Sequence, residues 1–357
     1  MPKKHLMKGN EVFIEAALQA GCKFYAGYPI TPQNEASEYM SKRAADFNAI
    51  FIQAEAELSA INMLFGASAA GFRCMTSSSS PGISLKQEGI SYIAAAELPC
   101  VIVNIVRGGP GLGNIRASQA DYFQAVKGGG HGDYKLIVLA PSTLQELYDL
   151  TMNAFDYADY YRNPVLILSD GILGQLIEPV ELKKYHPILE LPSKKSWILD
   201  GCKGRKPHVI KTLLLEPPDL LVKHNIHLQR KYEKIKKELS LCEEHKTEDA
   251  EIIVTAYGIS ARVCREAVDI ARGNGIKAGL IQPITLWPFP NNFFKKHKGK
   301  EFLVVEMSNG QFIEDVKLSL ECDGTFHFLG YGGGWYPDTE QIVQKLKGIK
   351  NEHRENT

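Results

Sequence analysis

The amino-terminal half of the chain alternates short apolar segments with longer segments of helical pattern, and this alternation limits the possible folds more than any other feature. The apolar segments include "FRCMTSS", "PCVIVNIVR" and "NPVLILSD", and helical stretches such as "SLKQEGISYIAAAEL" lie between them. Parallel strands need long crossovers, and the crossover helices bury both faces of the sheet. Residues 1–184 are therefore expected to form an α/β domain whose parallel sheet is covered by helices.

The alternation stops after about residue 184 and returns near residue 249. Residues 185–248 combine a stretch rich in Lys and Pro with a charged helical segment, "HNIHLQRKYEKIKKEL", in which apolar positions are sparse. We interpret this range as a connector. Residues 249–357 begin with "EIIVTAYGISARVCREAVDIARGNGIKAGLIQP", which has the order strand, turn, helix, turn, strand. They predict a second, smaller α/β domain.

Composition excludes several classes of protein. The chain has 357 residues, with 41 Lys and Arg against 41 Asp and Glu. Such a balance gives no electrostatic basis for binding nucleic acid or an anionic membrane surface. No apolar run approaches the roughly 18 residues of a membrane span. The start of the chain, "MPKKHLMKGN", lacks the apolar region of a signal peptide.

The cysteines are odd in number and widely spaced, at positions 22, 74, 100, 202, 242, 264 and 322. They form no C-x-x-C pair, and the histidines do not cluster with them. We therefore expect no iron–sulfur cluster, no structural zinc and no other metal site in this chain. Unpaired thiols are typical of the cytoplasm, which is the expected location.

Two glutamates, Glu55 and Glu57, stand at the start of an otherwise apolar helix in "FIQAEAELSAINMLFGASAAGF" (51–72). Acidic groups in a first helical turn usually serve the helix dipole, an effect of a few tenths of a kcal/mol. The alternative is a catalytic carboxylate. Both glutamates are candidates for that role, and Glu55 is the weaker of the two.

Polar residues also follow other apolar strands. Arg107 ends "PCVIVNIVR", where a guanidinium can bind a carboxylate through two hydrogen bonds or simply lie at the surface. The stretch "TSSSSPGIS" (76–84) could bind an anion or a polar ring, or only cap the next helix. The Gly-rich "RGGPGLGN" (107–114) gives weak support for a dinucleotide site, because no helix clearly opens behind it.

The segment around Glu57 resembles the pyrimidine-binding domain of thiamine-diphosphate enzymes. It shares a glutamate, a helix of small residues, a glycine at Gly66 and a turn that ends in glycine. Longer motifs extend the likeness over nearly the whole chain, namely "YPITPQNE", "QAEAELSAINM", "MTSSSSPGISLKQEGISY", "ELPCVIVNIVRGGPGLG", "SQADYFQAVKGGGHGDY", "AYGISAR" and "LIQPITLWPFP". With these motifs the chain resembles the α subunit of 2-oxoacid:ferredoxin oxidoreductases, most closely that of the branched-chain enzymes.

The resemblance implies a reaction and a division of labour. A branched-chain 2-oxoacid such as 3-methyl-2-oxobutanoate would be decarboxylated on thiamine diphosphate. Its acyl group would pass to coenzyme A, and two electrons would pass through iron–sulfur clusters to ferredoxin, as in anaerobic metabolism. The α chain would supply the pyrimidine domain (1–184) and a domain similar to the transketolase carboxy-terminal domain (249–357).

The remaining parts would come from partner chains. A β subunit would share the cofactor and hold its diphosphate and Mg²⁺, a ferredoxin-like subunit would carry the clusters, and a γ subunit is a further partner that the resemblance allows. The diphosphate half of such sites needs Gly-Asp-Gly, and no Asp-Gly pair of this chain follows a glycine. The chain is thus expected to provide half of an active site.

The matching motifs also imply roles for individual residues. Glu57 would bind the aminopyrimidine ring and tune its protonation. Thr31 and Arg107 would bind the carboxylate of the oxoacid. The cofactor side of the site would be lined by Tyr28, Pro29, Ile30 and Ser80. Ser80 matches least well, because Ser80, Pro81 and Gly82 lie where many thiamine enzymes carry "TSGPG", and the first glycine of that pattern is Ser80 in this chain.

Three alternatives remain open from the sequence. The same chemistry could act on 2-oxoglutarate, pyruvate or an arylpyruvate, since pocket size decides the preference. The chain could be a scaffold subunit that has kept the fold without catalysis, although intact Glu57, Thr31 and Arg107 disfavour this. A nucleotide-binding oxidoreductase is the third alternative, and the missing fingerprint disfavours it.

Overall fold

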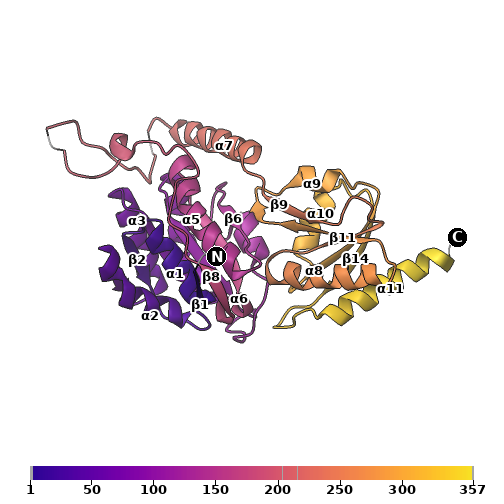
Figure 1. Cartoon of the computed structure of the whole chain (residues 1–357). Coiled ribbons are helices and arrows are strands. Elements are labelled where there is room, and N and C mark those ends of the chain that lie inside the picture. The colour runs from indigo at the N-terminus through magenta and orange to yellow at the C-terminus, as the bar shows by residue number, and fades with distance from the viewer. Residues whose placement is uncertain (1–2, 203, 215, 356–357) are drawn as a thin grey trace.

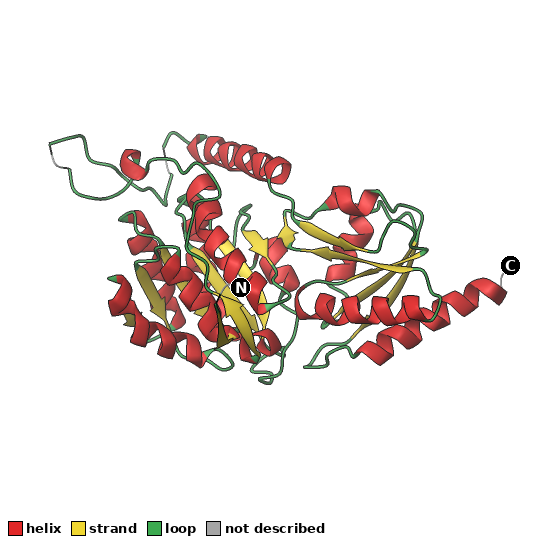
Figure 2. Ribbon diagram, viewed as in Figure 1, coloured by secondary structure: helices red, strands yellow, loops and turns green. Residues whose placement is uncertain are grey.

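The computed structural model describes residues 3–202, 204–214 and 216–355. Their strands form a seven-stranded sheet, a five-stranded sheet and a two-stranded ribbon. Figure 1 shows the larger sheet in an amino-terminal lobe and the five-stranded sheet in a second lobe beside it. In both lobes helices cover the strands (Figure 2). The predicted fold class, two α/β units built on parallel strands, is confirmed.

The seven-stranded sheet is parallel except at one edge, and its order is β12-β6-β7-β5-β4-β2-β3. Its strands are β2 (Phe24–Gly27), β3 (Ile50–Gln53), β4 (Cys74–Ser78), β5 (Val101–Val106), β6 (Ile137–Leu139), β7 (Val165–Asp170) and β12 (Thr285–Trp287). Every residue of β4, β5, β6 and β7 is buried. Burial on both faces explains why these segments are apolar without alternation.

The helices of this lobe connect the strands. They are α1 (Gly9–Gln19), α2 (Asn34–Arg43), α3 (Glu57–Ala69), α4 (Ser80–Ala95), α5 (Leu144–Tyr161) and α6 (Gly171–Gln175), with short turns η1 (Ala44–Phe47) and η2 (Gln124–Gly128). Helix α1 packs against α5, and α3 packs against α4. Helices α3 and α4 approach closely at Gly89, where an added Cβ would lie 2.6 Å from Cγ2 of Ile61. The ribbon pairs β1 (Lys4–Lys8) with β8 (Ile177–Glu181).

The second lobe contains the five-stranded sheet, in the order β14-β13-β10-β11-β9. Its strands are β9 (Cys242–His245), β10 (Ile252–Thr255), β11 (Ala278–Pro283), β13 (Glu301–Glu306) and β14 (Thr325–Gly330). Only β9 runs antiparallel to its neighbour. The helices are α8 (Gly258–Gly273), α9 (Asn291–Lys295), α10 (Phe312–Ser319) and α11 (Thr339–Glu355). Among the described residues, no helix is both long enough and apolar enough to cross a membrane.

Two strands lie outside the lobe that sequence order suggests. Strand β12 comes from the range predicted as the second domain, yet it pairs with β6 at the edge of the first sheet. Strand β9 comes from the range interpreted as a connector, yet it pairs with β11. The connector range also contains η3 (Lys194–Ser196) and helix α7 (Leu220–Glu238), whose Leu228, Tyr232 and Ile235 are buried. Each sheet therefore includes a strand from outside its predicted range. The domain bounds themselves remain a prediction.

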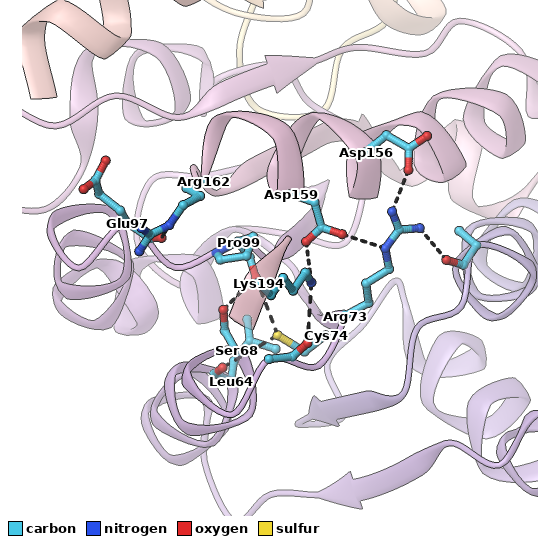
Figure 3. A network of polar contacts seen from close by, with 12 residues as sticks. Leu64, Ser68, Arg73, Cys74, Glu97, Pro99, Asp156, Asp159, Arg162 and Lys194 are labelled. Carbon is cyan, nitrogen blue, oxygen red and sulfur yellow. Dashed lines mark hydrogen bonds and ion pairs between the residues drawn. The ribbon is translucent and has the colours of Figure 1, made fainter. Parts of the chain in front are cut away.

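A buried polar network holds the start of the connector range against the first lobe (Figure 3). The Arg73 guanidinium contacts Asp156 Oδ1 at 2.6 Å and Asp159 Oδ2 at 2.8 Å. Asp159 Oδ1 also accepts the Lys194 ammonium at 2.6 Å. The arginine is mostly buried, and removal of one partner from such a pair leaves an uncompensated buried charge. This network fixes the chain near residue 194 to helix α5.

The two lobes meet around one buried glutamine. Gln119 donates from Nε2 to the Tyr257 carbonyl at 2.8 Å, and its Oε1 accepts the Ser260 hydroxyl at 2.9 Å. Its backbone N–H donates to the Met307 carbonyl at 2.9 Å, and Met307 N–H donates back to Gln119 Oε1 at 2.9 Å. Because both ends of its amide group are satisfied by the second lobe, Gln119 fixes one relative placement of the lobes.

Candidate active site

The predicted site residues follow neighbouring strands at a single edge of the first sheet. The turn Tyr28–Thr31 follows β2, Glu57 follows β3, Ser80 follows β4, and Arg107 follows β5. These strands are adjacent in the order β5-β4-β2-β3 and parallel to one another. The carboxyl ends of parallel strands are where α/β sheets bind ligands. The topology thus gathers these four segments at one edge.

Glu57 is the first residue of α3, and its side chain is buried although it ends in a carboxyl group. Its carboxylate lies against the first turn of α4. A Cβ added to Gly82 would lie 2.6 Å from Glu57 Oε1 and 2.1 Å from the Ser78 hydroxyl oxygen. Only glycine leaves room for the carboxylate at this position, so the sequence "SSPG" after β4 sets where Glu57 can lie.

Glu55 has a different environment from Glu57. Its side chain is exposed and accepts a hydrogen bond from the Ser59 hydroxyl, one helical turn on, at 3.1 Å. That contact is an ordinary surface interaction at a helix start. Glu57 is thus buried and Glu55 is exposed, and Glu57 is also the residue that the resemblance favoured.

Arg107 and Thr31 come together although 76 positions separate them. The Arg107 guanidinium donates from Nη1 to the Thr31 carbonyl at 2.9 Å and from Nη2 to the Leu112 carbonyl at 3.1 Å. Its Nε is buried and has no hydrogen-bond partner. Each terminal nitrogen uses one of its two hydrogens in these bonds, so the group retains donors for a further acceptor. An unpaired buried donor of this kind is typical of a ligand site.

Ser80 links the start of α4 to Arg107 at the end of β5. Its hydroxyl accepts the Arg107 backbone N–H at 3.0 Å and donates to the Arg107 carbonyl at 3.3 Å. Its own N–H donates to Asn104 Oδ1 at 3.1 Å, and Asn104 donates to Asp121 at 2.9 Å. Burial raises the pKa of Asp121. The Ser80 side chain thus holds the end of β5, and its contact with a cofactor remains a prediction.

Three of the predicted lining residues form the turn after β2. Tyr28 and Pro29 are exposed, and Ile30 is half-buried. The Ile30 carbonyl accepts the Gln33 N–H at 3.0 Å, and the Thr31–Pro32 peptide is cis. None of these three has a described contact with Glu57, so their roles remain a prediction.

Thr31 also lines a cleft of about 1020 Å³ between the lobes. Polar side chains of Asn34, Glu35 and Arg116 face it from the first lobe, and Tyr336 faces it from the second. The Gly-rich segment beside this cleft is a loop closed on itself, with Gly108 N–H bonded to the Arg116 carbonyl at 2.8 Å. The next helical element, η2, begins only at Gln124. This geometry does not favour the dinucleotide alternative.

Two residues at the site were missed by sequence reasoning. Gly82 was assigned only to a motif, and its close approach to Glu57 could not be known before the strands were placed. Lys86, one turn further along α4, is fully buried, and its ammonium donates to the Glu57 carbonyl at 3.4 Å. Desolvation lowers the pKa of Lys86 to about 8, against the field of Glu57, which raises it. The i, i+4 spacing of Gly82 and Lys86 was a usable signal, because it places both on one helical face.

The comparison with protein families matches most of the chain. Residues 15–243 match the family described as "Pyruvate flavodoxin/ferredoxin oxidoreductase, thiamine diP-bdg". Residues 250–342 match "Pyruvate:ferredoxin oxidoreductase core domain II". The break between the two lies close to the predicted start of the second domain.

Curated relatives match along nearly their whole length. The chain is 47% identical to the ketoisovalerate oxidoreductase subunit VorB of Methanothermobacter marburgensis, covering 97% of this chain and 98% of that protein. It is 38% identical to the 2-oxoglutarate synthase subunit KorA of Methanocaldococcus jannaschii, covering 88% of this chain and 91% of that protein.

Among solved structures, the chain is similar to the 2-oxoglutarate:ferredoxin oxidoreductase from Magnetococcus marinus with 2-oxoglutarate, coenzyme A and succinyl-CoA bound. The TM-score is 0.88 at 25% identity, and the match covers 97% of this chain and 65% of that one. A split-gene transketolase, an inactive β4 tetramer, matches with a TM-score of 0.58 at 13% identity, covering 96% of this chain and 97% of that one, which shows a shared fold alone.

Proposed function

The chain belongs to the pyruvate flavodoxin/ferredoxin oxidoreductase family, and on that premise we propose that it is the thiamine-binding α subunit of a branched-chain 2-oxoacid:ferredoxin oxidoreductase. The complex converts 3-methyl-2-oxobutanoate and its relatives to acyl-CoA, CO₂ and reduced ferredoxin. The observation that carries the proposal is the buried Glu57 carboxylate, which lies against Gly82 in the first turn of α4. Ser80, in the same turn, accepts the backbone N–H of Arg107. The Arg107 guanidinium in turn donates to the Thr31 carbonyl.

The residues present fit one end of thiamine diphosphate. Glu57 offers a carboxylate, and the hydroxyls of Ser78 and Ser79 are buried without hydrogen-bond partners. These groups suit an aminopyrimidine, which carries both donors and acceptors. Among the described residues, no group of three or more His, Cys, Asp or Glu could hold a metal ion. We assign the diphosphate and its Mg²⁺ to a partner β subunit, because no Asp-Gly pair of this chain follows a glycine.

In the proposed mechanism this chain positions groups rather than forming bonds. Thiamine diphosphate, when bound, would supply the nucleophilic carbon and the electron sink that decarboxylation of a 2-oxoacid needs. Glu57 holds or releases a proton at its carboxylate, facing the pyrimidine ring. Arg107 and Thr31 bind the oxoacid carboxylate and orient the bond that breaks.

Exposed apolar side chains on α3 and α4 favour the binding of a partner chain at this surface. On α3, Leu58 is 48% exposed and Met63 37%, and on α4, Leu85 is 59% exposed and Tyr92 38%. Grouped exposed apolar residues are typical of protein interfaces. We assign this surface to the β subunit, which completes the cofactor site. A ferredoxin-like subunit carries the iron–sulfur clusters, ferredoxin accepts the electrons, and a γ subunit is a further partner.

Substitution of Arg107 by Ala should mainly raise KM for the oxoacid, because the substrate loses a charge-assisted pair of hydrogen bonds. Steady-state kinetics of the complex would measure this. Arg107→Lys keeps the charge without the planar fork and should give an intermediate KM. An unchanged KM in Arg107→Ala would show that the side chain only braces the loop through the Leu112 carbonyl.

The loop after Arg107 offers a basis for the preference among oxoacids. Leu112 is 82% exposed and Ile115 62%, and the Leu112 carbonyl is bonded to the Arg107 guanidinium. We assign the side chains of Leu112 and Ile115 to the wall that contacts the branched alkyl group. The double change to Ala should lower kcat/KM for 3-methyl-2-oxobutanoate by about 10–200-fold, the range for lost apolar contacts in a substrate pocket. The value for pyruvate should change much less, and an equal loss for both acids would contradict the assignment.

The proposed function is tested by anaerobic, coenzyme A-dependent reduction of a viologen dye by the native complex, isolated through this chain, over a panel of 2-oxoacids. Preference for 3-methyl-2-oxobutanoate is the expected result. Preference for 2-oxoglutarate, pyruvate or an arylpyruvate would keep the chemistry and overturn the branched-chain assignment. No activity with any acid, with clusters intact and thiamine diphosphate added, would indicate a scaffold subunit.

A further inference from the structure

Helix α4 carries a buried lysine that the proposed mechanism has not used. The Lys86 side chain has no solvent exposure, so its ammonium cannot reach water. Its one described hydrogen bond goes to the Glu57 carbonyl at 3.4 Å, and two of its three donors have no described partner. Among the described residues, no carboxylate lies within ion-pair distance of Lys86. Burial of an ammonium is costly unless the charge is paired and hydrogen-bonded, and one hydrogen bond offsets little of that cost.

The position of Lys86 relative to Glu57 is specific. Gly82 and Lys86 are one helical turn apart on α4, and both face the first residue of α3. Gly82 contacts the carboxylate end of Glu57, whereas Lys86 contacts its backbone carbonyl. One face of α4 therefore fixes both ends of the same residue.

Other titratable groups near α4 face elsewhere. Glu88 is exposed and accepts the Tyr92 hydroxyl at 2.7 Å. From the loop that follows η2, the Tyr134 hydroxyl contacts Gln87, and the His131 carbonyl accepts the Ser91 hydroxyl. Strand β5, which packs beneath α4, has the sequence VIVNIV and carries no titratable side chain. Glu57 is left as the charged group that acts on Lys86.

We propose that Lys86 is a positioning residue for Glu57: its ammonium holds the start of α3 and favours the ionised form of the Glu57 carboxylate. This inference rests on the proposed function of Glu57 and extends it. A nearby positive charge stabilises a carboxylate. The proton shared between Glu57 and a bound ring nitrogen is then displaced toward the ring. Lys86 thus acts through Glu57 and does not itself touch the substrate.

The test compares Lys86→Met with the wild type in the assembled complex. Methionine has a similar length and fills the same apolar space without a charge. The acid limb of the kcat/KM profile should move to higher pH by about one unit, a tenfold loss on that limb, because Glu57 is protonated more readily without the ammonium. The wild type should also show an alkaline transition near pH 8, where Lys86 loses its proton, and the variant should lack it.

A readout that does not depend on turnover is the pH dependence of unfolding. The folded state lowers the pKa of Lys86 from 10.5 to about 8, so the unfolded chain binds more protons between these values. The free energy of unfolding of the wild type should therefore rise from about pH 8 to about pH 10.5. Below pH 8 the full cost of burying the charged lysine lowers the stability of the folded state. Lys86→Met should remove this burial cost. The variant should therefore exceed the wild type in free energy of unfolding by more at pH 7 than above pH 10.5.

Lys231→Met is the matched control. Lys231 is also deeply buried, and its pKa is also lowered to about 8, but it pairs with Glu97 at 3.2 Å on the side of α7. This control should lose stability, because Glu97 loses its lysine and retains only His227 as a described ion-pair partner, at 3.0 Å. Its kcat/KM profile against pH should match that of the wild type. An unshifted profile in Lys86→Met, with Glu57→Gln inactive, would overturn the inference and leave the proposed function standing. Full activity of Glu57→Gln would overturn both.

Discussion

Replacement of Glu57 by Gln is expected to lower kcat of the assembled complex by 10²–10⁴-fold, the usual contribution of one general acid–base group. Glutamine has nearly the same shape, so it still fits the space that Gly82 leaves. It cannot hold or release a proton at that place, which is the property that the proposed mechanism requires. The measurement is single-turnover and steady-state viologen reduction with 3-methyl-2-oxobutanoate, with thermal unfolding to confirm that the fold is intact.

Glu55→Gln is the control for this prediction. The two glutamates are two positions apart, but Glu55 is exposed and bonds only with Ser59 among the described residues. Its replacement should change kcat by less than about threefold, in line with the small energies of surface contacts. Equal losses in the two variants, or a larger loss for Glu55, would show that the catalytic carboxylate has been misassigned.

Replacement of Gly82 by Ala is expected to have the second-largest effect. The new methyl group would lie 2.1 Å from the Ser78 hydroxyl oxygen and 2.6 Å from Glu57 Oε1, so at least one of these groups must move. A misplacement of about 1 Å at a reacting group can cost about 100-fold in rate. Overpacking should also destabilise the fold by about 1–3 kcal/mol. Kinetics of the complex and thermal unfolding of the chain would measure the two effects separately.

A glycine elsewhere in the chain shows what the same substitution does without a clash. Gly348 lies within α11, and nothing lies within 4 Å of the place where its Cβ would be. Gly348→Ala should stabilise the protein by about 0.5–1 kcal/mol, because alanine is the better helix former. Activity of Gly82→Ala within about twofold of the wild type would mean that Glu57 tolerates displacement, and would weaken its catalytic assignment.

Much of this arrangement could be predicted from the sequence, because it depends on strand order alone. Apolar segments separated by helices indicate parallel strands, and parallel strands bring their carboxyl ends to one edge. Ser80 and Arg107 each follow a predicted strand, so a common edge could be expected for them. The strand Ile50–Gln53, which precedes Glu57, was not among the predicted strands. The separation of Glu57 from Glu55 also followed from spacing, and the difference in burial agrees with it.

Other features could not be predicted, because they depend on contacts between distant segments. No local pattern indicates that the Ser80 hydroxyl is bonded to the backbone of Arg107. The burial of Lys86 opposed its usual preference for the surface, and only the packing of α4 on α3 explains it. Gly66, which contributed to the resemblance, has nothing within 4 Å of its would-be Cβ in this chain, so no contact within the chain requires it to be glycine.

The pairing of β12 with β6 has a consequence for how the protein is made. Strand β6 lies at Ile137–Leu139, and its neighbour on that side lies at Thr285–Trp287. During synthesis the edge of the first sheet therefore stays open until the ribosome has added roughly 150 more residues and released them from its tunnel, which takes about 10–30 s at usual rates of elongation. An open edge can pair with a neighbouring nascent chain. A gene truncated after the first lobe should for the same reason yield an insoluble product, and the two halves should be recovered together only when they are produced together.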